Sequence, residues 1–117
     1  MSRATALVDE VANELSTWPG VRIERVTAEE ALVRYDEIEL GTLYRESGVA
    51  ELPFLGEEFD SLVEEGDAEP AELASGDSGV SHGIHGPSDV TAVLELFDRR
   101  YREVRGDDQP YSSQDPS

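Results

Sequence analysis

Apolar residues recur at helical spacing near both ends of the chain. The N-terminal stripe consists of Ala4, Leu7, Val8, Val11, Leu15 and Trp18. The C-terminal stripe consists of Val90, Val93, Leu94, Phe97, Tyr101 and Val104. Intervals of three and four residues place each set on one helix face. Pro19-Gly20 ends the first predicted helix, and Pro87 suits the first position of the last one.

Between these helices, short runs of alternating or β-forming residues predict strands. The runs are residues 21–24, 31–35, 38–40, 49–54 and 80–84. Turn-forming pairs at 36–37 and 47–48 separate neighbouring runs. We therefore predict an antiparallel meander of four strands and a fifth strand later in the chain.

A short acidic helix is predicted between the fourth and fifth strands. Phe59, Leu62 and Val63 share one helical face, and Gly66 suits the position after the last turn. Residues 67–79 are predicted to form a loop. Within it, Gly-Asp-Ser-Gly at 76–79 is interpreted as a turn and not as a serine-protease motif.

The predicted order is α-β-β-β-β-α-β-α. Runs of strands favour an α+β fold, with a mostly antiparallel sheet of about five strands and helices packed on one face. The length of 117 residues suits one core. We predict a single domain over residues 1–105 and a disordered acidic tail over 106–117, which lacks a core-forming pattern.

The charge composition is extreme. The formal net charge is −18, and all nine basic residues are arginine, against 27 acidic residues. Such a charge opposes compact folding unless salt screens it, and the Debye length falls to about 3 Å at 1 M salt. We predict a haloarchaeal-type protein from the cytoplasm of a salt-accumulating cell.

Composition also excludes several function classes. Without cysteine there is no disulfide or thiolate chemistry, and without lysine there is no P-loop or Schiff base. No lysine or arginine lies between Arg45 and Arg99, so we predict no nucleic-acid partner. No apolar run reaches the ~20 residues of a membrane span, and no signal-peptide pattern opens the chain. We predict a soluble cytoplasmic protein without a membrane partner.

The two histidines and the C-terminal arginines are candidate binding groups. His82 and His85 lie three apart, so on a regular strand they face opposite sides and cannot share one ion unless Gly83 and Gly86 kink the chain. We predict neither a metal site nor a cofactor. Four arginines between Arg99 and Arg105 form either a docking patch or a cluster that stabilises a helix C-terminus.

Several segments in order resemble the small luciferase-like domain family, named after the fungal luciferase. They are residues 39–44 (ELGTLY), 48–54 (GVAELPF), 62–70 (LVEEGDAEP) and 77–81 (DSGVS), followed by a long helix. The resemblance covers residues 18–104 and implies an α+β fold.

The chain departs from that family at its expected site. The family's first motif carries two histidines where this chain has Thr42 and Tyr44, and its second histidine pair corresponds to Ala71 and Glu72. An acidic family position is kept as Glu51. The oxygenase-like activity that the family name implies is therefore not expected.

The leading hypothesis is a non-catalytic domain that binds a small molecule or a protein partner through the region of the family's pocket. The candidate ligand-binding residues are Thr42, Tyr44, Glu51, Glu72, His82 and His85. One alternative is an enzyme with a rebuilt site, in which His82 or His85 acts as general base beside Glu51 or Glu72. Another is a protein–protein interaction module. The sequence leaves the catalytic residues, the ligand, and the choice between monomer and homodimer open.

Overall fold

The computed structural model describes residues 3–54, 56–73 and 78–106. The elements in chain order are α1 (Arg3–Leu15), β1 (Val21–Arg25), β2 (Glu30–Tyr35), β3 (Ile38–Tyr44), β4 (Val49–Leu52), α2 (Gly56–Glu64), β5 (Glu69–Glu72), β6 (Ser78–Gly83) and α3 (Pro87–Arg105). The α+β prediction is confirmed. Residues 107–117 of the predicted tail and residues 76–77 of the predicted turn lie outside the described residues, whereas Ser78 and Gly79 belong to β6.

The six strands form one sheet in the order β1-β2-β3-β4-β6-β5, and every neighbouring pair is antiparallel. The predicted loop over residues 67–79 was wrong where β5 forms. Glu69–Glu72 contains no β-forming side chain, so its sequence gives no strand signal. It pairs with β6 alone, at the sheet edge, where the missing N–H of Pro70 is tolerated.

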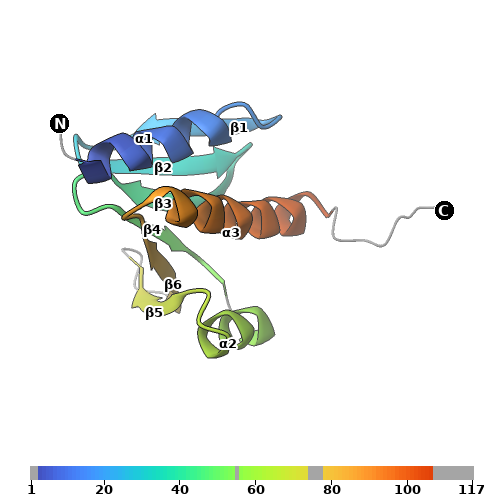
Figure 1. The fold of residues 1–117 in the computed structure, drawn as a ribbon. Coiled ribbons are helices and arrows are strands. Elements are labelled where there is room, and N and C mark those ends of the chain that lie inside the picture. Colours follow the sequence, from blue (N-terminus) through green and yellow to red (C-terminus); the bar gives the residue numbers. More distant parts are fainter. Residues whose placement is uncertain (1–2, 55, 74–77, 107–117) are drawn as a thin grey trace.

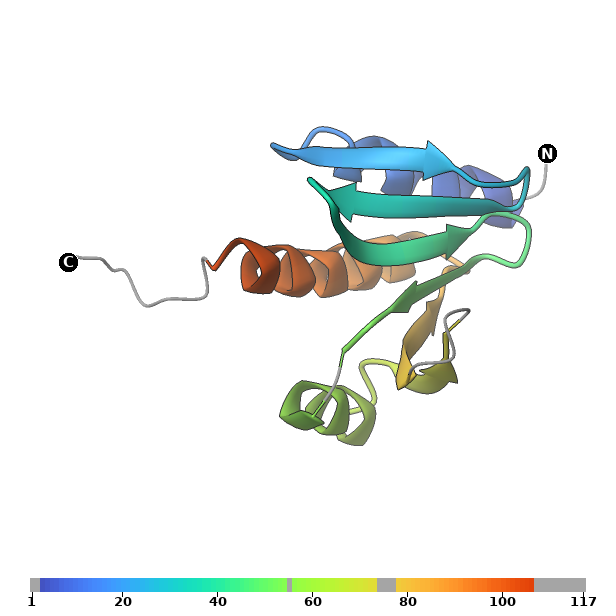
Figure 2. The ribbon, with the colours of Figure 1, turned by 180° about the vertical axis from the view of Figure 1, so that it is seen from behind.

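The helices α1 and α3 lie side by side across one face of the sheet (Figure 1). The reverse view in Figure 2 looks onto the other face, and among the described residues no helix crosses β1 to β4 there. The short helix α2 lies beside the β5–β6 end, where Glu58 pairs with Arg99 of α3 at 2.8 Å. No helix in the described part of the chain is long and apolar enough to cross a membrane.

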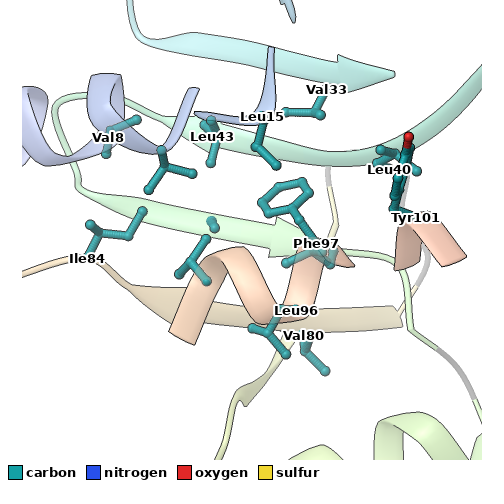
Figure 3. Packing of buried hydrophobic residues seen from close by; sticks show 14 of the residues in the cluster. Val8, Leu15, Val33, Leu40, Leu43, Val80, Ile84, Leu96, Phe97 and Tyr101 are labelled. Atoms are coloured by element: carbon teal, nitrogen blue, oxygen red, sulfur yellow. The ribbon is translucent and has the colours of Figure 1, made fainter. Parts of the chain in front are cut away.

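The core fills the space between the sheet and the two long helices. Phe97 of α3 is fully buried and lies among side chains from α1 and the central strands (Figure 3). The bordering side chains labelled there include Leu15, Val33, Leu43, Leu96 and Val80. Packing of this face accounts for the helical stripes in the sequence.

A β-bulge in β3 sets the direction of the side chains that follow it. Val33 pairs with Gly41 and Arg34 pairs with Glu39, so Leu40 is the extra residue and is fully buried. A Cβ atom on Gly41 would lie 2.7 Å from the carbonyl oxygen of Glu51 and 2.9 Å from the Phe97 ring. Only glycine fits there, directly before the strand turns Thr42 to the opposite face.

The predicted helix end at Gly66 is confirmed, and α3 ends in the same way. Gly66 after α2 and Gly106 after α3 have positive φ values of 79° and 76°. The first helix is shorter than its apolar stripe, since α1 ends at Leu15. Trp18 instead packs on Tyr101 of α3, with ring centroids 5.1 Å apart.

Candidate functional site

Three of the six predicted ligand residues share the uncovered face of the sheet, which we call the open face. Leu43 and Ala50 are fully buried beneath the helices, so Thr42, Tyr44 and Glu51 point the other way by strand alternation. Thr42 and Glu51 are directly opposite residues of β3 and β4. Opposite side chains on one face are in reach of each other.

A hollow of about 240 Å³ lies on the open face around Thr42 and Glu51. Its lining residues are Val26, Glu30, Leu32, Glu39, Thr42, Glu51 and Leu73. Leu73 contributes to the lining from the segment after β5, and it packs against Gly79 of β6, where an added Cβ would lie 2.8 Å from Leu73 Cδ2. The hollow therefore combines apolar surface with three carboxylates, and we call it the open-face hollow.

Thr42 presents an unpartnered hydroxyl to this hollow. Its exposed fraction is 7%, and within the described residues its hydroxyl makes no hydrogen bond. Its oxygen is not one of the fully buried side-chain atoms that lack a partner, so it remains accessible from the hollow. The site thus contains a free hydrogen-bonding group that a ligand can satisfy.

Tyr44 holds Glu51 in place beside the hollow. Its hydroxyl donates to Glu51 Oε1 at 3.1 Å. Burial, followed by the negative charges of Glu51, Glu30 and Glu39, raises the pKa of Tyr44 to about 12. The phenol therefore stays protonated near neutral pH and acts as a hydrogen-bond donor, not as a base.

His82 lies on the opposite face from Glu51. It pairs with Ala50 across β4 and β6, whereas Ser81 pairs with Glu51. Its Nδ1 atom lies 2.7 Å from the carbonyl oxygen of Gly83. It lines a separate hollow of about 370 Å³ together with residues of α2, of α3 and of the segment between α2 and β5, among them Asp67, Glu95, Asp98 and Arg99.

His85 and Glu72 are also apart from the open-face hollow. His85 follows β6, and its backbone N–H donates to the Asp89 carboxylate at 2.9 Å. Glu72 is exposed on the edge strand β5, beside Phe59 and Pro70. The predicted set of six residues therefore divides into four places, and only Thr42, Tyr44 and Glu51 stay together.

Sequence reasoning missed Glu30, Glu39 and Leu73 as lining residues of the open-face hollow. Glu30 faces Tyr44 across β2 and β3, and Glu39 enters the hollow from before the bulge at Leu40. The alternation of β2 and β3 gave a signal for Glu30. The sequence gave no signal for Glu39, which precedes the bulge, or for Leu73, which follows the unpredicted strand β5.

The arginine cluster of α3 is engaged within the chain. Arg99 pairs with Glu58, Arg100 with Glu103 at 2.9 Å, and Arg102 with Asp98 at 3.1 Å. Arg105 lies over the Tyr101 ring, 4.8 Å from its centroid. These contacts favour the interpretation that the cluster stabilises the helix and its contact with α2.

Another hollow, of about 350 Å³, lies between α1 and strands β1 to β3. An ion pair closes its rim, where Arg45 Nε and Nη2 donate to the two oxygens of Asp9, each at 2.9 Å. This hydrogen-bonded arginine holds the pKa of Asp9 below its usual range. The pair joins α1 to the turn after β3 and is structural in character.

Within the described part of the chain, no group of three or more histidine, aspartate or glutamate residues is arranged to hold a metal ion. Comparison with models of protein families, with curated proteins and with solved structures finds no match to this chain. The resemblance to the luciferase-like family thus rests on its motifs alone.

Proposed function

We propose that this protein is a non-catalytic domain that binds a small ligand in the open-face hollow. The observation that carries the proposal is the Thr42 hydroxyl. It belongs to a residue that is only 7% exposed, it has no hydrogen-bond partner among the described residues, and it is accessible from the hollow. Small-molecule sites combine apolar walls with a few placed polar groups. The apolar walls here come from Leu32, Leu73 and Val26, and the polar groups are those of Thr42 and Glu51.

The chemistry of the hollow supports binding over catalysis. Tyr44 keeps its proton near neutral pH, and the Glu51 carboxylate already accepts that hydroxyl at Oε1. The alternative enzyme needs an imidazole beside Glu51 or Glu72. His82 lies on the far face of the sheet from Glu51, and neither His82 nor His85 lines the open-face hollow.

A protein–protein module is the other alternative. Addition of a strand would use one of the two sheet edges, β1 or β5. β5 carries Glu69, Pro70 and Glu72, and charges and proline on an edge strand oppose pairing with another chain. The arginines of α3 have partners within the chain. A small ligand therefore fits these surfaces better than a protein partner.

We also propose that the chain is a diverged relative of the luciferase-like family adapted to a salt-rich cytoplasm. Motif order supports the family, and the −18 charge without lysine supports the adaptation. The thermal midpoint should rise steeply between 0.05 and 3 M KCl, because salt screens repulsion between carboxylates. An unchanged midpoint would reject the adaptation.

Ligand binding can be tested by mapping backbone amide shifts at 1 M KCl with benzylamine, benzyl alcohol and benzoate, each up to about 10 mM. At least one probe should shift amides around Thr42 and Glu51. Thr42→Val should abolish or weaken those shifts, while Thr91→Val, at an exposed position of α3, should leave them unchanged. The absence of shifts on the open face with all three probes would reject the proposal.

A further inference from the structure

The charge around the open-face hollow is one-sided. Its lining includes Glu30, Glu39 and Glu51 but, among the described residues, no arginine or histidine. The fields of all three carboxylates act on the same phenol, since each raises the pKa of Tyr44. Arg34, a cation of this face, donates its Nε–H to Glu24 Oε1 at 2.9 Å. An occupant with a positive charge is therefore favoured electrostatically.

The hollow suits a molecular cation better than a metal ion. Among the described residues the carboxylates do not form a group that could hold one metal ion. They surround about 240 Å³ of space, and Val26, Leu32 and Leu73 supply apolar surface to it. Such a site matches a cation with an attached apolar group, whose body displaces water from those side chains.

Thr42 supplies an observation that is independent of the acidic residues. The residue is only 7% exposed, and its hydroxyl, which has no hydrogen-bond partner within the described chain, is accessible from the hollow. Thr42 lies directly opposite Glu51, so one donor-rich group can contact both side chains. The Tyr44 hydroxyl fixes Glu51 Oε1 at 3.1 Å and leaves Oε2 for a ligand. An ammonium group offers three N–H donors, which suit a hydroxyl and a carboxylate together.

We propose that the open-face hollow binds a small primary ammonium ion with an apolar substituent, whose –NH₃⁺ group lies between Thr42 and Glu51. This inference rests on the proposed function, since it names the class of ligand for the same site. Tyr44 is a positioning residue in it, because it orients the Glu51 carboxylate. Glu30 and Glu39 contribute long-range attraction from the rim.

The test compares benzylammonium with benzyl alcohol, a neutral molecule of nearly the same shape, by titration of backbone amide shifts. A background of 1 M KCl reduces the Debye length to about 3 Å and suppresses general attraction to the acidic surface. Benzylammonium should bind at Thr42 and Glu51 about tenfold more tightly than benzyl alcohol, as expected for a hydrogen bond to a charged group.

Three variants identify the groups that recognise the cation. Glu51→Gln and Thr42→Val should each weaken benzylammonium binding about tenfold, and only Glu51→Gln should remove the preference over benzyl alcohol. Glu57→Gln is the matched control, because it removes the same charge from an exposed position of α2. It should leave the affinity unchanged. The amide spectrum of each variant shows whether it is folded, and Thr42→Val tests the site even if Glu51→Gln does not fold.

The outcomes separate this inference from the proposed function. Equal binding of benzyl alcohol and benzylammonium at Thr42 would overturn the cation preference and leave the ligand site in place. Failure of both probes and of benzoate would overturn both proposals. Equal weakening by Glu57→Gln and Glu51→Gln would show attraction to the acidic surface as a whole and would also overturn the inference.

Discussion

The two faces of the sheet differ in what their side chains do, although the same strands build both. On the covered face, Val33, Leu43 and Ala50 are fully buried against α1 and α3. On the open face, Thr42 and Glu51 alternate with them and line the open-face hollow. Because side chains alternate along a strand, residues that stabilise the fold and residues that line the ligand site are neighbours in the sequence but lie on opposite faces. Substitutions on one face should leave the property of the other nearly intact.

The covered face should show the largest loss of stability. Phe97→Ala removes the fully buried ring at the centre of the core (Figure 3) and should lower the free energy of unfolding by about 3–5 kcal/mol. Denaturant unfolding at 2 M KCl measures this. Thr42→Val, on the open face, should change it by less than about 1 kcal/mol, because no protein hydrogen bond is lost within the described residues. Similar costs for the two variants would contradict the division between faces.

Gly41 lies where the two faces meet, and its replacement should have the next largest effect. In Gly41→Ala the new methyl group would lie against the Glu51 carbonyl and the Phe97 ring, so the free energy of unfolding should fall by about 1–3 kcal/mol. Gly86→Ala is the control, since it has open space and an extended backbone, and it should cost less than about 1 kcal/mol. An equal cost would show that the contact at Gly41 relaxes freely.

The Asp9–Arg45 pair at the rim of the covered face should appear in the acid dependence of stability. The pKa of Asp9 is lowered in the folded state, so its contribution is complete above the unfolded pKa near 3.8 and is lost as pH falls through the folded value. The stability difference between the protein and Asp9→Asn should therefore shrink below about pH 4. A difference that is constant from pH 6 to pH 3 would contradict this, and Glu10→Gln on the exposed side of α1 serves as control.

The sequence predicted the covered face better than the open one. Repeated apolar intervals such as those around Val93 and Phe97 are determined by one long packing surface, and so are visible in the chain itself. Thr42 and Tyr44 were placed together for the same local reason, since they lie two apart on a strand.

The residues that complete the open-face hollow depend on pairing between distant segments. A shift of one residue in the register of two paired strands moves every side chain of one strand to the other face of the sheet. In the observed register of β4 and β6, Glu51 is paired with Ser81, and His82 is paired with Ala50 on the other face. β5 forms because β6 offers a partner, so the composition of Glu69–Glu72 does not reveal it. The bulge at Leu40 likewise arises from pairing with β2.

The smallest effect, and the most direct measure of the open face, is the titration of Tyr44. Burial and neighbouring carboxylates raise the pKa of its phenol to about 12, so the absorbance change removed by Tyr44→Phe should be centred there and not near 10. Since the raised pKa means that the folded state holds this proton longer, the associated stability is complete below pH 10 and declines between 10 and about 12. The variant Glu51→Gln removes the negative charge of Glu51, which is the second largest cause of the raised pKa of Tyr44, but it leaves the largest cause, burial. The pKa of Tyr44 should therefore fall part of the way back toward 10. Full return to 10 would make the Glu51 charge the dominant cause. No change would show that Tyr44 does not hold Glu51, and the oriented carboxylate on which the ligand site depends would be lost with it.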